Sequence, residues 1–339
     1  MKYLLFLLLF VTFVCSAQRS DFKDINFDKV DSIAKIYQDY SLRNLPLLVH
    51  SLTHNLSTDV EKFRAIYMWI CFNIEADHYF AEKTTKKIKK LKYDSVAFSN
   101  WNKETLSYFF KRLLTERKTI CSGYAYLLKE LSSLAGINCQ IIDGYKRTPT
   151  SNLFNFEQPN HSWNAVLLNN KWYLADATLA SGYYFVNEDV FVKNYNDGYF
   201  LAEPMLFAKS HYPLDKNWLL LYEMLNESKF VEAPIIYNKT FLHKVVPMYP
   251  SKFESKIQEG DEMVFALKIL DELDINEIHF HVVRGFKSES IKSSDYTAEN
   301  GVLEFKYQFK NKGIHDVQIA VGNDIVVSYV VEVSKPKDL

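Results

Sequence analysis

The sequence has no excess of charge of one sign. It contains 40 Lys and Arg against 41 Asp and Glu, which gives a formal net charge of −1. Proteins that bind nucleic acid through their overall charge carry a clear surplus of basic residues. The composition therefore gives no electrostatic reason to expect a nucleic-acid partner, and we predict none.

Long hydrophobic runs are also missing, except at the N-terminus. After residue 14 no apolar run is long enough to span a bilayer, which takes about 20 residues. The apolar run Tyr3–Val14 follows Lys2 and leads into small residues that end at Ala17. This order is typical of a cleaved secretory signal. We expect residues 1–17 to be a signal peptide, the mature chain to be exported (periplasmic or secreted), and no integral membrane segment to remain. Lipid anchoring at Cys15 is the alternative.

Cysteine is scarce, and removal of the signal peptide leaves Cys71, Cys121 and Cys139. An odd number of cysteines in an exported protein leaves at least one free thiol. Cys71 and Cys139 either form a disulfide or are both buried as small apolar residues. The sequence around Cys121 favours it as the free thiol.

Aromatic residues are abundant, with 22 Tyr and 25 Phe in 339 residues. Disordered chains have few aromatic residues, so this chain folds. Its length suits one large domain or two ordinary ones. We expect an α+β domain over residues 18–228, followed by a β-sandwich of immunoglobulin-like type over residues 229–339.

The first domain begins with helices. Residues 18–54 have a mostly helical pattern, and Thr58 with Glu61 forms a capping-box pattern that predicts the start of the next helix. Residues 83–92 hold six lysines; we interpret them as a solvated surface segment, with contact to an anionic polymer as the alternative. A further helix is predicted over residues 103–116, with Leu106, Phe109, Phe110, Leu113 and Leu114 on its apolar side.

Past residue 228 the pattern changes to short alternating strands separated by turn residues. This pattern is typical of a β-sandwich. We place the domain boundary between residues 226 and 234. The segment over residues 197–221 is predicted to be irregular and to wrap the first domain. Five strands are predicted in the second domain, over residues 263–270, 278–283, 303–309, 316–321 and 325–333.

Cys121 stands at the start of a helical run that ends at Gly136. Backbone N–H groups at a helix start have no partner within the helix, and the helix dipole favours negative charge there. Both effects stabilise a thiolate, which is the reactive form of cysteine. The amide of Cys121 also offers one donor to an oxyanion.

His161 and Asp176 belong to two strands, residues 161–168 and 171–176, joined by Asn169 and Asn170. Asn tolerates positive φ, so a tight hairpin turn is expected there. A two-residue turn pairs Leu168 with Lys171 and places His161 and Asp176 on the same face as diagonal neighbours. A one-residue slip would separate them. In this arrangement the carboxylate orients the imidazole, which activates Cys121.

Each residue has a simpler interpretation. A Cys at a helix start is often a small core residue, and a His on a strand is often only hydrogen-bonded. A zinc site built from the same three residues is a further alternative, but no CxxC pair supports it. We predict no metal and no cofactor.

The blocks CSGYAYLLKELSSLAGINCQIIDGY and HSWNAVLLNNKWYLADAT resemble the transglutaminase-like superfamily, in which Cys, His and Asp form a papain-type triad. The segment DGYFLAEPMLFAKSHYPLDKNWLLL is similar to the kyphoscoliosis peptidase-like branch, where a β-rich domain often follows. The resemblance covers roughly residues 60–221. It implies a papain-like catalytic domain in the first part of the chain.

The resemblance implies Cys121 as nucleophile, His161 as general base and acid, and Asp176 as the residue that orients His161. Trp163 and Asn164 belong to the His-x-Trp-Asn block of the family and are candidates to shape the substrate or oxyanion site. The resemblance also implies Trp101 as a candidate for the second oxyanion donor. The alternative is that Trp101 is only an aromatic residue of the core. The branch usually has Trp where this chain has Leu179, which changes the wall of the site.

The resulting hypothesis is an exported cysteine-nucleophile amide-bond hydrolase or acyltransferase. Its partner would be a peptide, protein or cell-wall peptide substrate. The alternative is a catalytically silent transglutaminase-like module that binds or scaffolds. The sequence does not choose among substrates and leaves the oligomeric state open.

Overall fold

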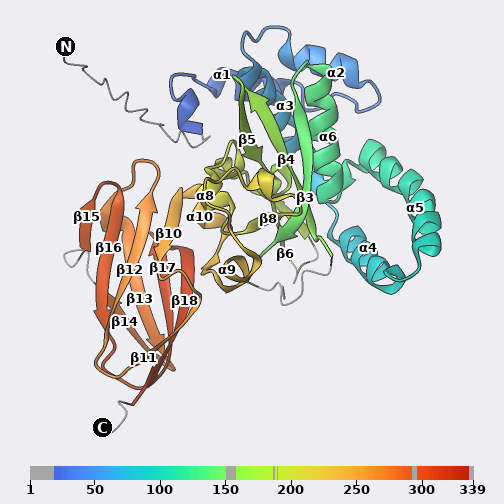
Figure 1. Cartoon of the computed structure of the whole chain (residues 1–339). Coiled ribbons are helices and arrows are strands. Elements are labelled where there is room, and N and C mark those ends of the chain that lie inside the picture. Colours follow the sequence, from blue (N-terminus) through green and yellow to red (C-terminus); the bar gives the residue numbers. More distant parts are fainter. Residues whose placement is uncertain (1–18, 150–157, 186–187, 189, 292–295, 336–339) are drawn as a thin grey trace, which may run out of the picture.

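The computed structural model describes residues 19–149, 158–185, 188, 190–291 and 296–335 (Figure 1). The predicted signal peptide lies outside these residues, as does most of the loop before His161. Within the described part of the chain, no helix is long and apolar enough to cross a membrane.

The first domain is built around helix α3. The capping box of Thr58 and Glu61 starts this helix, as predicted, and α3 buries most of its residues. Helices α1, α2, α6 and α7 pack against it. The helical elements up to the predicted nucleophile are η1 (Arg19–Phe22), α1 (Asp28–Ile36), α2 (Leu45–Thr53), α3 (Asp59–Asn73), α4 (His78–Leu91), α5 (Ser95–Glu116) and α6 (Cys121–Leu134).

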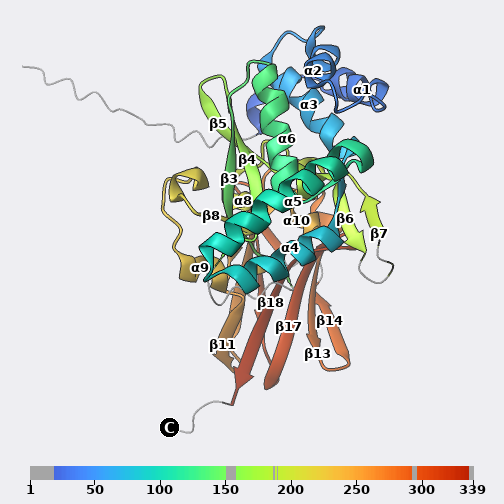
Figure 2. The same ribbon diagram turned by 90° about the vertical axis from the view of Figure 1, so that its right-hand side faces the viewer.

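Helices α4 and α5 lie on the outside of this domain (Figures 1 and 2). The six lysines that were interpreted as a surface segment belong mostly to helix α4 and its end. The predicted apolar side of α5 was wrong in part. Leu113 is buried, but Leu106 and Leu114 are 51% and 41% exposed because α5 covers little of the core. Strand β1 (Glu75–Ala76), before α4, pairs in parallel with β2 (Lys118–Thr119), after α5. This pairing holds the two ends of the α4–α5 segment together.

A four-stranded antiparallel sheet carries the predicted site. Its order is β5-β4-β3-β8, with β3 (Cys139–Lys146), β4 (His161–Leu168), β5 (Lys171–Ala175) and β8 (His211–Pro213). The turn between β4 and β5 has positive φ at Asn169 and Asn170, and Leu168 pairs with Lys171 as predicted. Helix α6 packs on β3 and β4. The segment expected to be irregular thus contributes β8 at the sheet edge.

Short elements connect this sheet to the second domain. They are α7 (Ala177–Ser181), β6 (Gly182–Phe185), β7 (Val190–Lys193), η3 (Asp197–Tyr199), α8 (Pro204–Phe207), η4 (Lys216–Leu219), α9 (Glu227–Glu232), β9 (Ile235–Ile236) and α10 (Asn238–Leu242). Helix α9 lies at the predicted boundary, and β9 already pairs with a strand of the second domain.

The second domain is a β-sandwich, as predicted. One sheet has the order β10-β12-β16-β15, and the other β11-β18-β17-β13-β14. All five predicted strands are present, although β17 begins earlier than predicted. The strands are β10 (Val245–Tyr249), β11 (Glu254–Gln258), β12 (Glu262–Ile269), β13 (Ile278–Arg284), β14 (Lys287–Ile291), β15 (Tyr296–Glu299), β16 (Val302–Gln308), β17 (Gly313–Val321) and β18 (Asp324–Ser334). A short 3-10 helix, η5 (Ile275–Glu277), precedes β13.

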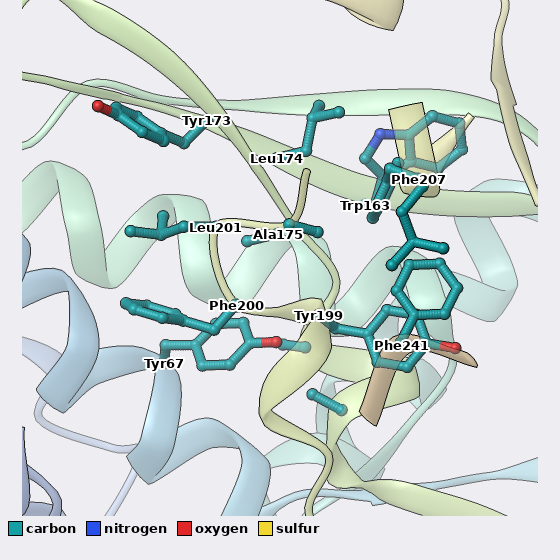
Figure 3. Packing of buried hydrophobic residues seen from close by; sticks show 14 of the residues in the cluster. Tyr67, Trp163, Tyr173, Leu174, Ala175, Tyr199, Phe200, Leu201, Phe207 and Phe241 are labelled. Carbon is teal, nitrogen blue, oxygen red and sulfur yellow. The ribbon is translucent and has the colours of Figure 1, made fainter. Parts of the chain in front are cut away.

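One hydrophobic core continues from the first domain toward the second. Figure 3 shows Tyr199 and Phe241 at the point of contact, and their rings stack with centroids 4.1 Å apart. Phe241 belongs to α10, which also packs on β18. Burial of such aromatic side chains contributes much of the stability of an interface. The two domains therefore share a packed junction beside the sheet of the site.

Candidate active site

Cys121 is the first residue of α6, as predicted. The residue before it is extended, and Gly123 allows the close approach of the turn. A Cβ at Gly123 would lie 1.9 Å from Thr119 Oγ1, so a larger residue would force the strand and the helix start apart. The thiol therefore stands where unpaired helix amides point.

His161 and Asp176 lie together because of the hairpin register. Asn164 pairs with Ala175, so the register of β4 and β5 is the one that a two-residue turn predicts. In that register His161 and Asp176 lie on the same face of the hairpin. His161 Nε2 lies 2.6 Å from Asp176 Oδ2. An ionised carboxylate only accepts hydrogen bonds, so Nε2 carries the proton and donates it. Nδ1 remains for the thiol.

Asp176 is held from several directions and is fully buried. Its Oδ1 accepts a hydrogen bond from Leu179 N at 2.9 Å, because Asp176 is the N-cap of α7. Its backbone carbonyl accepts one from Tyr67 Oη on α3 at 3.0 Å. The carboxylate is thereby oriented toward His161 by both its own helix and the central helix.

The Cys121 thiol and the His161 ring lie close enough for each to shift the pKa of the other. Burial opposes the charged imidazolium, but the Asp176 carboxylate and the Cys121 thiol outweigh it and raise the pKa of His161 to about 9. Burial also opposes the thiolate, yet the hydrogen bond and charge of His161 lower the pKa of Cys121 below its ordinary value. Burial likewise opposes ionised Asp176, but the two histidines hold its pKa well below the usual range. The arrangement favours a thiolate–imidazolium pair.

Sequence analysis missed a second histidine at this carboxylate. His211 on β8 places Nε2 3.2 Å from the same oxygen, Asp176 Oδ2. Its Nδ1 lies 3.0 Å from Ser210 Oγ. Burial is the main cause that lowers the pKa of His211 to about 4, so this ring is neutral at pH 7. The sequence did contain a signal for this residue, because His211 lies in the segment that is similar to the kyphoscoliosis peptidase-like branch. However, His211 reaches Asp176 only because β8 pairs with β3.

The other predicted residues have different surroundings. Trp163 is 1% exposed, and its ring packs against the rings of His161 and His211. It therefore holds the two histidines in place and does not line an open substrate site. Asn164 donates hydrogen bonds to the carbonyls of Ala125 and Gln140, which ties β4 to α6 and β3.

Trp101 lies on the outer helix α5, where its ring packs on Phe98 of the same helix. In the described part of the chain it has no hydrogen bond or ring contact with the triad residues. The structure therefore does not bring Trp101 to Cys121, and the second oxyanion donor has no assignment.

His161, Asp176 and His211 also form a group whose ligand atoms lie within 4.8 Å of one another, which is close enough for a metal ion. Both Nε2 atoms point at one carboxylate oxygen at hydrogen-bond distance, and a metal would have to replace both bonds. The geometry fits hydrogen bonding as it stands. The absence of a metal stays a prediction.

A pocket of about 530 Å³ adjoins the triad. Thr178 and Leu179, which directly follow the Asp176 region, line it together with Lys146 at the end of β3. Leu179, the residue that departs from the branch pattern, is thus part of a pocket wall. The pocket lies on the α7 side of the site, next to the residues that follow Asp176.

The remaining cysteines are free and buried, so the two do not form a disulfide. Burial raises the pKa of Cys139 to about 12 and raises the pKa of Cys71 well above its ordinary value. Such thiols are unreactive. Cys121 is therefore distinguished from both by its exposure and by its histidine partner.

Comparison with known proteins agrees with this geometry. A sequence model of the transglutaminase-like superfamily matches residues 47–177, which include all three triad residues. Kyphoscoliosis peptidase of Homo sapiens is 35% identical over 198 residues, which is 58% of this chain and 27% of that protein. Hillarin of Drosophila melanogaster is 26% identical over 230 residues (64% and 26%), and cytokinesis protein 3 of Saccharomyces cerevisiae is 23% identical over 199 residues (57% and 22%).

Residues 47–177 match the transglutaminase-like superfamily. The kyphoscoliosis peptidases of Homo sapiens and Mus musculus, 35% and 34% identical over 198 residues, support a kyphoscoliosis peptidase-like assignment. The chain spans about a quarter of the length of these relatives.

Proposed function

We propose that this protein is an exported cysteine-nucleophile hydrolase or acyltransferase that acts on amide bonds. The observation that carries the proposal is the chain of contacts from Cys121 through His161 to Asp176, with Nε2 and Oδ2 2.6 Å apart. The name of the human relative, a peptidase, supports the same class of reaction. Export rests on the N-terminal sequence alone.

In the proposed reaction the Cys121 thiolate attacks the amide carbonyl carbon and forms a carbon–sulfur bond. The amide at the start of α6 stabilises the oxyanion. His161 gives its Nδ1 proton to the leaving nitrogen as the carbon–nitrogen bond breaks, which leaves a thioester. Water, deprotonated by His161, then attacks the thioester and releases a carboxylic acid and the thiol. An amine in place of water would give transfer instead.

We favour hydrolysis because water needs no acceptor site of its own. Substrates of the proposed class are peptides, proteins and cell-wall peptides. Asp176 keeps the negative charge that supports the imidazolium throughout, because hydrogen bonds to both of its carboxylate oxygens outweigh the effect of its burial.

The test is labelling of the protein with a thiol-reactive peptide amide analogue, followed by peptide mass mapping. We expect Cys121 to be labelled in the wild type and no labelling in Cys121→Ala. A Cys139→Ala variant is the matched control and should be labelled like the wild type. Equal labelling of wild type and Cys121→Ala, or labelling only at Cys71 or Cys139, would contradict the proposal.

The second candidate is a catalytically silent binding module. It is supported by the sandwich domain and by the departure at Leu179. If a Cys121→Ala strain kept the full cellular function of the protein, this candidate would replace the first.

A further inference from the structure

The pocket beside the triad has a cationic lining. Lys146, Arg147 and Lys239 line it, and among the lining residues that the structure describes there is no Asp or Glu. The pocket lies between the end of β3, helix α7 and the segment that leads into the second domain. A pocket with one sign of charge concentrates ligands of the opposite sign.

Lys146 is the cation placed nearest the chemistry. Gly144 pairs with His161 across β3 and β4, and Lys146 lies two residues farther along β3. Residues two apart on a strand share a face, so Lys146 and His161 are on the same face of the sheet. Lys146 also pairs with His211 on β8. Its side chain therefore extends from the triad face toward the pocket.

The three cations differ in their partners. Arg147 donates a hydrogen bond to the carbonyl of Pro234 at 2.8 Å, and Lys239 forms an ion pair with Asp324 at 3.1 Å. The Lys146 ammonium has neither an ion pair nor a hydrogen bond with any residue that the structure describes. A half-buried ammonium without a partner is costly to keep charged.

The electrostatics of Lys146 agree with this position. Burial lowers its pKa, while the negative charges of Asp176 and Cys121 act in the opposite direction. The ammonium is thus close enough to the triad to interact with it. An anion in the pocket would restore the charged form fully.

Much of the remaining wall is apolar, with several aromatic side chains beside a few polar ones. The apolar and aromatic residues include Tyr183, Tyr184, Phe191 and Leu179. The pocket is therefore suited to a side chain with an apolar stem and a charged end.

We propose that Lys146 makes this pocket a subsite for a carboxylate of the substrate, so that the preferred substrate is an acidic peptide with Glu or Asp near the scissile amide. The proposal rests on the proposed amide-bond chemistry of Cys121. The carboxylate has two sources, an acidic side chain and a free C-terminus, and both would bind the same ammonium.

The experiment uses synthetic peptide libraries in which one position at a time is an equimolar mixture of Glu and Gln. Each library is made with a free acid and with a carboxamide at the C-terminus. The products of digestion by the full-length protein are counted by mass spectrometry. We expect peptides with Glu at one position to be cleaved about tenfold faster than those with Gln, since a charge-assisted hydrogen bond contributes about that factor.

Lys146→Met is expected to bring the Glu-to-Gln ratio to about one, whereas Lys146→Arg keeps a preference because the charge remains. Lys287→Met, at an exposed lysine of the sandwich, is the matched control and should keep the wild-type ratio. A preference that depends on the free C-terminus instead of a Glu position identifies the terminal carboxylate as the bound group. Thermal unfolding of Lys146→Arg shows that the site remains folded.

The outcomes separate the two proposals. Cleavage that needs Cys121 but shows no preference for a carboxylate overturns the subsite alone, as does an unchanged preference in Lys146→Met. No cleavage by the wild type of any library, together with no labelling at Cys121, overturns the proposed chemistry and the subsite with it.

Discussion

Asp176 has two sides, and they differ in chemistry although both present a histidine to the same oxygen. On the open side, His161 contacts the partly exposed Cys121 thiol. On the closed side, His211 is enclosed by Phe207, whose ring stacks on it with centroids 3.8 Å apart, and by the hydroxyl of Ser210. The pKa of His161 is raised to about 9 and that of His211 is lowered to about 4.

The difference shows how one carboxylate can bind a charged histidine on one side and a neutral histidine on the other. His161 gains a second negative partner in the thiol, which stabilises its charged form. His211 has only neutral groups around its other nitrogen, and a second positive charge beside His161 would be repelled. The open side is therefore equipped for proton transfer, and the closed side holds the carboxylate in place.

The largest expected effect comes from breaking the open side. His161→Asn removes the general base and acid, and we expect the rate of Cys121-dependent amide cleavage to fall by about 10³-fold or more. Initial rates measured on a peptide found to be cleaved by the wild type check this. His211→Asn is the matched control, because it changes the other histidine at the same oxygen. Equal losses in both variants would contradict the division into two sides.

Replacement of the shared carboxylate should have the next largest effect. Asp176→Asn keeps the shape but removes the charge that raises the pKa of His161, so we expect a loss of about 10²-fold in rate. The pKa of Cys121 should rise toward the ordinary value of about 8.5. The pH profile of iodoacetamide labelling at Cys121 should therefore shift to higher pH. A profile that stays in place would show that Asp176 does not support the imidazolium.

The neutral state of His211 on the closed side should make the free energy of unfolding depend on pH in mild acid. An unfolded His takes up its proton near pH 6.5, whereas folded His211 does so only near pH 4. The unfolded state therefore binds more protons in this window, and the wild type should lose up to about 3 kcal/mol of unfolding free energy as the pH falls from 6.5 to 4. His211→Asn should lose correspondingly less.

Urea unfolding at several pH values measures this difference. The windows of the neighbouring groups are separate: the stability that His161 contributes is lost as the pH rises through about 9, and that of Asp176 is lost only in stronger acid. His50→Asn, at an exposed histidine of α2, is the matched control and should follow the wild type. Parallel curves for wild type and His211→Asn would contradict the neutral state of His211.

The smallest effect is expected at Ser210. Ser210→Ala removes the hydroxyl that contacts His211 Nδ1 at 3.0 Å, which should cost about 1 kcal/mol of unfolding free energy. Activity should stay within about twofold of the wild type, since the Ser210 hydroxyl reaches the Asp176 carboxylate only indirectly, through the His211 ring. Urea unfolding and initial rates check both values. A tenfold loss of activity would place Ser210 among the residues that position Asp176.

Local sequence patterns were enough for much of the site. The helical run that begins at Cys121, the turn at Asn169 and Asn170, and the shared face of His161 and Asp176 all follow from patterns in residues close in the chain. These patterns are the apolar spacing of a helix, positive φ at Asn and the two-residue period of a strand. The capping box at Thr58 followed the same logic, and it formed as predicted.

Other features depended on contacts between distant residues. His211 lies 35 residues after Asp176 and reaches it only because β8 pairs with β3. The exposure of Leu106 and Leu114 follows from where α5 lies, which the apolar pattern of that helix did not predict. Trp101 was a candidate oxyanion donor by the family resemblance, but its helix is on the outside of the domain (Figure 2).

The sequence by itself therefore determined where the thiol, the imidazole and the carboxylate of the candidate site lie in their helix and strands, because strand alternation and short-range turns place them. Only the tertiary structure decided the second histidine at Asp176 and the lining of the pocket. These depend on which sheet edge receives β8 and on where α7 and the connecting segment pack. Burial and long-range pairing set those positions, and a linear pattern carries little information about either.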